Sequence, residues 1–224
     1  WIKYGPHLAA PRDREIFDAR EKLIFRQTGD SLIGTHISSG YIMRDNTHIV
    51  LPRADVETNL MFVLGVMNSL AANYYYWSIN PEKGEGLAQI KLFHIASIRI
   101  PKASEDEQIA VALAVLDLLQ RNRVLRAKTR TFRRVIESEY AIIKRPTLLD
   151  RWWTLGFQDL LKAIGTRLSL PQRAQLSEYF EEAKDEALLL HSQIDNSELK
   201  IDRMVNSLFG LSADDVQRIK DRLS

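Results

Sequence analysis

The chain has 224 residues, 45% of them hydrophobic, which suffices for one large or two small domains with a buried core. It contains no cysteine, which excludes a disulfide scaffold and any zinc site with thiolate ligands. The net charge of +2 combines 31 basic with 29 acidic residues, so composition alone does not indicate nucleic-acid binding. We find no signal peptide or membrane segment, and expect a cytoplasmic protein. Because the chain begins at Trp1, we also expect it to be a fragment of a longer protein.

Short β-branched or aromatic runs alternate with turn residues in the first hundred residues, which predicts strands. The predicted strands are residues 23–27, 32–37, 41–43, 48–51 and 97–100. Between the last two, residues 59–77 carry apolar side chains at the spacing of a helix that is buried on one face. This half of the chain should therefore be mixed α and β.

A long helix is predicted to begin at the capping box Ser104-Glu105-Asp106-Glu107 and to end near Lys144, before Pro146. Its apolar residues keep a heptad spacing, which is typical of a helix that lies along a partner helix. They are Val115, Leu118, Leu125, Phe132 and Ile136.

A second long helix is predicted after Pro171, and Gly210 should stop it. Ser212-Ala213-Asp214-Asp215 should then cap a short final helix. The second long helix also carries a heptad seam, so we expect it to pair with the first helix in antiparallel fashion, with residues 151–170 as the connection. The seam consists of Phe180, Ala183, Ala187, Leu190, Ile194, Ile201, Met204 and Leu208. The predicted class is thus α+β, with a mixed, β-rich domain at residues 1–103 followed by long antiparallel, coiled-coil-like helices at residues 104–224.

An arginine and a glutamine stand side by side at the end of the first predicted strand, in Ile24-Phe25-Arg26-Gln27-Thr28-Gly29-Asp30. The arginine donors match O6 and N7 of guanine, and the glutamine amide matches N6 and N7 of adenine. Since side chains alternate between the faces of a strand, we expect at most one of the two to point into a DNA groove. For Arg26 the alternative is an internal salt bridge.

Two further segments accompany this one, Asn80-Pro81-Glu82-Lys83-Gly84-Glu85-Gly86-Leu87-Ala88-Gln89-Ile90-Lys91 and Ile201-Asp202-Arg203-Met204-Val205-Asn206-Ser207-Leu208-Phe209-Gly210-Leu211. In this order the three segments resemble the TaqI-like C-terminal specificity domain of adenine-N(6) DNA methyltransferases, of the type IIG restriction-modification kind. In that family the domain selects the DNA sequence on which a separate methyltransferase domain, and often a nuclease domain, acts. The resemblance implies a bacterial or archaeal protein whose partners are double-stranded DNA and its own N-terminal methyltransferase domain.

A weaker similarity concerns Ile98-Arg99-Ile100-Pro101 leading into Glu107-Gln108-Ile109, which resembles half of the S subunit of type I restriction enzymes. In those proteins the helices are a spacer that holds the recognition domain at a fixed distance from its methyltransferase. Both resemblances imply that residues 1–103 are a target-recognition domain and residues 104–224 a helical spacer and docking region.

The candidates for DNA contact follow from these segments. Lysines beside Gly84 and Gly86 can approach phosphates closely, although a solvated loop with surface lysines is the alternative. The first set of candidates is Arg26, Gln27, Lys83, Gln89 and Lys91, and Arg44 is a further candidate for the DNA backbone.

A basic run on the first long helix contains no acidic residue. It consists of Arg121, Arg123, Arg126, Lys128, Arg130, Arg133 and Arg134. Four of them fall at helical spacing on one stripe that can follow phosphates, namely Arg123, Arg126, Arg130 and Arg133, and the first three are candidates for the DNA backbone. The alternative, which we favour on the sequence, is that the run pairs with acids of the second long helix, namely Glu181, Glu182, Asp185 and Glu186.

No catalytic residue and no metal site is predicted within the chain. Asn80-Pro81 is followed by Glu82 rather than by the Pro-aromatic pair of an adenine methyltransferase loop, and no glycine-bearing turn for a methyl donor is found. Glu198-Leu199-Lys200 resembles half of a nuclease site but falls in a predicted helix. His36 and His48 lack a third ligand. We therefore expect S-adenosylmethionine, and Mg²⁺ if the parent also cleaves DNA, in domains outside this chain.

A different function remains open beside DNA recognition. The chain could be a protein-interaction module, a coiled coil with a β-rich head that contacts no nucleic acid. The near-neutral net charge favours this alternative.

Overall fold

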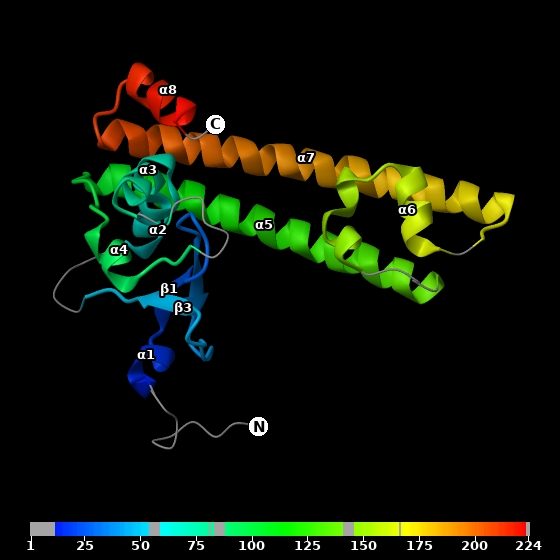
Figure 1. Ribbon diagram of the computed structural model, residues 1–224, viewed down its shortest axis with the longest axis horizontal. Helices are drawn as coiled ribbons and strands as arrows, with labels where there is room; N and C mark the ends of the chain where they lie inside the picture. Colours follow the sequence, from blue (N-terminus) through cyan, green and yellow to red (C-terminus); the bar gives the residue numbers. More distant parts are fainter. Residues whose placement is uncertain are drawn as a thin grey trace. The chain divides into compact units, whose positions relative to one another are not determined.

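The computed structural model describes residues 12–53, 59–80, 82, 88–140, 146–165 and 167–222, and Figure 1 labels its elements. By packing, the chain forms two compact units, Trp1–Val115 with Lys200–Ser224, and Leu116–Leu199. The predicted α+β class is confirmed by a small antiparallel sheet and long helices. Among the described residues, no helix combines the length and the apolar character needed to cross a membrane.

The sheet of the first unit has three strands in the order β2-β1-β3. The central strand β1, Glu21–Arg26, pairs antiparallel with β2, Gly34–Ser38, and with β3, Thr47–Val50. Side chains alternate along the second half of β1: Leu23 and Phe25 are fully buried, Ile24 is half-buried, and Arg26, on the same face as Ile24, is exposed. This alternation places Arg26 outside the hydrophobic core.

Two of the predicted strands are wrong. Residues 41–43 form no strand, because Tyr41 and Ile42 are 57% and 67% exposed in the loop after Gly40 and have no apolar surface to cover. Residues 97–100 are not a strand either: Ser97 ends the helix α4, Leu92–Ser97, and the following three residues have no regular structure. The predictions at 23–27, 32–37 and 48–51 correspond to β1, β2 and β3.

The first unit also contains a short helix before the sheet, α1, Arg14–Asp18. Lys22 of β1 is fully buried, and its ammonium group donates to the carbonyl oxygens of Phe17 and Ala19 at 2.5 and 3.1 Å. A buried charge needs such acceptors, and carbonyls at a helix C-terminus provide them. Lys22 therefore attaches α1 to the start of β1.

The single helix predicted at residues 59–77 is two helices, α2, Leu60–Asn68, and α3, Leu70–Ile79. Ser69 breaks the run because its backbone is extended, while its hydroxyl donates to Val66 O and accepts from Ala72 N. The amides of two asparagines then connect these helices to the sheet. Gly34 N donates to Asn68 Oδ1 at 2.8 Å, and Leu32 N donates to Asn73 Oδ1 at 2.7 Å.

The long helices α5, Glu105–Glu139, and α7, Leu170–Leu208, contribute one end each to the first unit. Gly65 of α2 leaves room for them, since a Cβ there would lie 2.9 Å from Val111 and from Val115 and 3.6 Å from Ile201. α2 thus lies between the sheet and the two helix ends (Figure 1). The third signature segment begins at Ile201 and is part of this packing.

The end of α7 and the last helix, α8, Ala213–Asp221, complete the first unit. Asp202 accepts from Leu70 N at 2.8 Å and so caps α3. α8 begins at the predicted cap Ser212, whose hydroxyl accepts from Asp215 N, and Arg222 donates to Tyr74 at 2.6 Å. Residues far apart in sequence therefore build one packed body.

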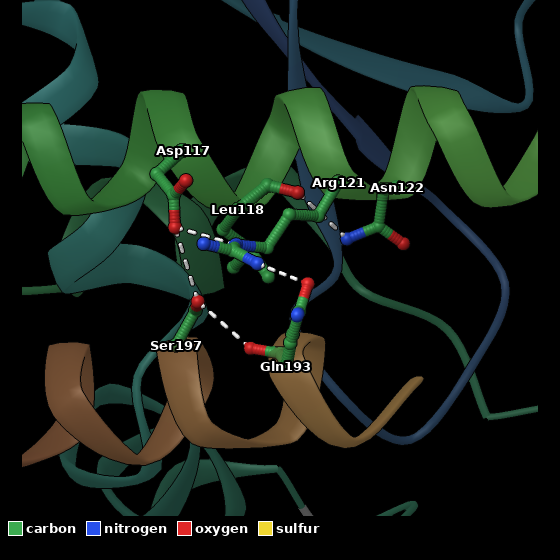
Figure 2. A network of polar contacts seen from close by, with 6 residues as sticks. All are labelled: Asp117, Leu118, Arg121, Asn122, Gln193 and Ser197. Carbon is green, nitrogen blue, oxygen red and sulfur yellow. Dashed lines mark hydrogen bonds and ion pairs between the residues drawn. The ribbon is translucent and has the colours of Figure 1, made fainter. Parts of the chain in front are cut away.

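In the second unit α5 and α7 run antiparallel, since contacts from later positions of α5 reach earlier positions of α7. Arg121 donates to Gln193 at 2.5 Å, and Lys128 pairs with Glu186 at 2.5 Å. Figure 2 shows the first of these contacts, with Asp117 bonded to both Arg121 and Ser197. The predicted antiparallel arrangement is present here.

The connection between the long helices, which was predicted at residues 151–170, contains regular structure of its own. It contains a 3₁₀ segment, η1, Pro146–Thr154, and a helix, α6, Phe157–Ile164. Trp152 stacks on Phe132 with ring centroids 3.8 Å apart and an interplanar angle of 11°. Phe180 of α7 joins the same buried cluster. The connection thus caps the helix pair with its own hydrophobic core.

Candidate DNA-recognition edge

The first two of the three segments that carry the family resemblance, which we call the signature segments, meet at the end of β1 through Thr28 and Gln89. Thr28 and Gln89 form an isolated antiparallel bridge. On either side of it, Gly29 N donates to Ala88 O and Ile90 N donates to Gln27 O, both at 2.8 Å. The backbone at residues 27–29 and 88–90 is therefore fixed by reciprocal hydrogen bonds, although the two stretches are far apart in sequence.

The start of β3 lies at the same end of the sheet. Thr47 is the register partner of Arg26, and Gln27 N donates to Asn46 O at 3.0 Å. Arg44 is exposed, and its carbonyl oxygen accepts from the amide and the hydroxyl of Thr47 at 3.3 and 2.9 Å. We call residues 26–31, 44–47 and 88–91 together the recognition edge.

Arg26 projects from this edge across a glycine. A Cβ at Gly29 would lie 2.6 Å from the guanidinium carbon, and Gly29 has a φ of +141°, which favours glycine. The internal salt bridge considered as an alternative is present as a 4.0 Å contact with Asp30, but the two side chains are 43% and 57% exposed. Such an exposed pair contributes little free energy, so the guanidinium remains available to a ligand.

Gln27 and Gln89 differ in exposure. Gln27 is half-buried, and its backbone amide and carbonyl are both used within the edge. Gln89 is exposed between the buried Ala88 and Ile90, so its side chain points outward from a fixed backbone. Of the adjacent pair Arg26 and Gln27, Arg26 is thus the exposed one, and Gln89 offers the exposed amide.

Glu82 organises the second segment. Its carboxylate pairs with Lys91 at 3.0 Å and accepts from Gln89 N at 2.8 Å. The hydrogen bond from Gln89, followed by the interaction with Lys91, lowers the pKa of Glu82 below its ordinary value. Lys91 is half exposed and has an acidic neighbour within the domain. The sequence did not predict this structural role of Glu82, which was noted only because it departs from the pattern of a catalytic loop. The opposite charges of Glu82 and Lys91 within one segment were the signal that could have predicted their ion pair.

Buried polar residues support the edge from below. His94 is 1% exposed, its Nδ1 accepts from Lys91 N at 3.2 Å, and its ring lies edge-on to Tyr76 at 5.3 Å. Burial lowers the pKa of His94. Asn80 donates to the Tyr76 hydroxyl at 2.5 Å and accepts from Glu82 N at 3.1 Å. The amide of Asn80 is thus engaged in supporting the fold.

The remaining candidates lie elsewhere. Lys83 falls outside the described residues. Arg123, Arg126 and Arg130 are exposed on α5 in the second unit. His48, discounted as a metal ligand, has its Nε2 at 2.5 Å from Ile90 O, which adds a contact between β3 and the edge. Among the residues that the structure describes, no three histidine or acidic side chains are grouped to hold a metal ion.

Two family models match the chain, each over a different range of residues. Residues 104–205 match the family model of a domain of unknown function, DUF8810. No curated protein matches the chain. Residues 1–100, which contain β1 and the whole recognition edge, match the family model of the TaqI-like C-terminal specificity domain. The resemblance inferred from the sequence segments is therefore confirmed for residues 1–100, which hold the first two of them.

Proposed function

We propose that this chain is the sequence-recognition module of an adenine-specific DNA methyltransferase or restriction-modification enzyme, and that it directs a separate catalytic domain to its target. The observation that carries this proposal is the Thr28–Gln89 bridge. It joins two signature segments of a specificity domain and leaves Arg26 and Gln89 as outward side chains on fixed backbone. A backbone that is already fixed loses no further entropy on binding, which favours direct readout of bases by the side chains that it carries.

The chemistry of the edge suits duplex DNA. Arg26 has a planar set of donors for a guanine edge, and Gln89 has one donor and one acceptor for adenine. Exposed Arg44 and Lys91 would contact phosphates and set the register. In this proposal Gln27 serves the fold through its backbone, and Arg26 and Gln89 discriminate between sequences.

The catalytic step belongs to other parts of the parent protein. The amide of Asn80 bonds Tyr76 and Glu82, so it is engaged within the fold instead of being free to hold a target base. Glu198 and Lys200 lie within α7, which is not the strand context of a nuclease site. S-adenosylmethionine, and Mg²⁺ where the parent also cleaves DNA, would bind in an N-terminal methyltransferase domain and its associated nuclease. The cytoplasm of a bacterium or archaeon is the compartment that we propose for this enzyme.

The test is selection from a random-sequence duplex pool with the chain joined to its catalytic domain. Enrichment of one short sequence supports the proposal, and its binding should weaken as salt rises because phosphate contacts release counterions. Binding without enrichment, or enrichment that Arg26→Ala together with Gln89→Ala leaves unchanged, would contradict readout by this edge.

If the chain is instead a protein-interaction module, the same experiment should detect no binding to duplex DNA. If the chain binds no duplex at any salt concentration but forms a stable complex with another protein, the near-neutral charge reflects a surface that avoids nucleic acid. The same binding series therefore separates the two functions.

A further inference from the structure

We propose that α5 carries a second DNA-contacting surface, formed by Arg123, Arg126, Arg130 and Arg134, which binds the phosphate backbone of duplex DNA independently of sequence. We call these four residues the arginine stripe. The inference rests on the proposed function for the identity of the polyanion. The arginine stripe differs from the stripe predicted from the sequence in one member, since Arg134 replaces Arg133. It lies on the face of α5 that is exposed to solvent.

The four arginines are exposed, and no described residue is close enough to neutralise their charge. None of them makes an ion pair or a side-chain hydrogen bond with another residue in the described part of the chain. The pairing that we favoured from the sequence, between this run and the acids of α7, occurs at Lys128 with Glu186. It does not extend to the stripe.

The other cations of the run are used within the second unit. Arg121 bonds Asp117 at 2.7 Å and reaches Gln193, as Figure 2 shows. Arg133 bonds Asp150 at 2.6 Å and Glu137 at 3.2 Å. The structure thus separates seven basic side chains into three that join elements together and four that face solvent.

Helical geometry places the stripe on one face. At about 100° per residue the four positions fall within an arc of about 80°, which is about 140° from the buried Phe132 and Ile136. Between Asp117 and Glu137 α5 contains no acidic residue, and both of these acids are bonded to other arginines. No acid of α5 therefore offsets the stripe along its length.

The groove between the helices does not neutralise the stripe either. A cavity of about 530 Å³ between α5 and α7 is lined on the α7 side by Glu182 and Glu186, and on the α5 side by Lys128 and small or apolar residues. None of the four arginines lines it. Glu182 and Glu186 of α7 thus lie beside Lys128 and not beside the stripe.

Duplex DNA is the partner whose charge spacing fits. At a rise of 1.5 Å per residue the stripe is about 16 Å long, a length over which a duplex presents about five phosphates on each strand. Guanidinium groups bind phosphate through paired hydrogen bonds. In the described part of the chain, these four guanidinium groups have no hydrogen-bond or ion-pair partner that would compete with a phosphate. A stable helix that carries four such groups at nearly regular intervals is a suitable surface for a regular polyanion.

The experiment compares two variants of the full chain that lower the net charge equally. The stripe variant combines Arg123→Gln, Arg126→Gln, Arg130→Gln and Arg134→Gln, substitutions that preserve helix propensity. The control combines Arg151→Gln, Lys162→Gln, Arg167→Gln and Arg173→Gln, all exposed in the same unit. Binding of a random-sequence duplex is measured by fluorescence anisotropy over a range of salt concentrations, and circular dichroism confirms folding of both variants.

We expect the stripe variant to reduce the slope of log affinity against log salt by about 3.6, because each of the four lost phosphate contacts removes about 0.9. Its affinity should fall more than tenfold for random and target duplexes alike, and the control should retain the slope of the unmodified chain. A double variant, Arg126→Gln with Arg130→Gln, should show about half the change.

Three outcomes would overturn the proposal. The first is an unchanged slope in the stripe variant while the chain still selects a target sequence, which leaves the proposed function intact. The second is an equal loss in the control, which reduces the effect to net charge. The third is equally strong, stripe-dependent binding of poly-glutamate, which assigns the surface to an acidic protein. A chain that binds duplex but selects no sequence would instead refute the proposed function alone.

Discussion

Gln89 lies opposite Thr28 in an antiparallel bridge, and its backbone amide donates to the carboxylate of Glu82 at 2.8 Å. Gln89 is thus held from both sides while its side chain remains exposed between two buried neighbours. The carboxylate of Glu82 therefore helps to position the backbone of Gln89, whose side chain we propose contacts DNA. The predictions below test this edge and the packing that supports it.

Arg26→Ala should reduce discrimination between target and random duplex by about 1 to 3 kcal/mol if Arg26 reads a guanine. Stability should change little, since the exposed 4.0 Å pair with Asp30 contributes little. Equilibrium binding to both duplexes, with thermal unfolding alongside, measures the two effects. Arg14→Ala, which removes another exposed arginine of the first unit, is the control. An equal loss on both duplexes would assign Arg26 to a phosphate.

Glu82→Gln should strengthen binding to random duplex and weaken discrimination. The variant removes a negative charge next to Lys91, so the salt slope should increase by about 1, and it also weakens the acceptor that orders Gln89. Because the pKa of Glu82 is lowered, the difference should persist throughout the neutral pH range. Glu21→Gln, at the opposite end of β1, is the matched control. If Glu21→Gln strengthens random binding as much, the effect is one of net charge.

Asp202→Asn should be neutral or stabilising at neutral pH, whereas Asp202→Ala should cost about 1 to 3 kcal/mol. Burial raises the pKa of Asp202 above its ordinary value of 3.8, so the folded state binds a proton more tightly than the unfolded state. The contribution of this carboxyl is therefore favourable below pH 3.8 and is lost as pH rises through the raised value. Asparagine avoids the buried charge and still accepts from Leu70 N.

Denaturant unfolding of both variants near neutral and at acidic pH measures this effect. Asp185→Asn, exposed on the same helix, is the control and should leave the free energy of unfolding nearly unchanged. A large destabilisation by Asp202→Asn at neutral pH would show that the charge itself is needed.

His94 should make the first unit less stable in mild acid. Burial lowers the pKa of His94 below 6.5, so the unfolded state takes up a proton at a higher pH than the folded state does. Stability linked to neutral His94 is thus full above pH 6.5 and is lost as pH falls below it. The advantage of the unmodified chain over His94→Gln should therefore shrink between about pH 7.5 and about pH 5.5. A constant difference across this range, measured by denaturant unfolding, would contradict the assignment.

Local patterns in the sequence determined much of this protein. The β-branched and aromatic runs between turns located the three strands, although they also predicted strands at 41–43 and 97–100 that do not form. The capping residues Ser104 and Ser212 located the starts of two helices, and Gly210 located the end of α7. The heptad seams predicted the antiparallel helix pair. The two short segments within residues 1–100 identified the specificity domain, because such segments are contiguous and need no tertiary information to be seen.

Only the tertiary structure decided which side chains are available to a partner. Gln27 and Arg26 are neighbours in sequence, but strand alternation and the bridge to Gln89 make the first half-buried and the second exposed. Arg133 and Arg134 are neighbours too, yet Asp150 and Glu137 take up the charge of the first and leave the second to solvent. Exposure and ion pairing depend on residues that are distant in the chain, so the sequence named the candidates and the packing selected among them.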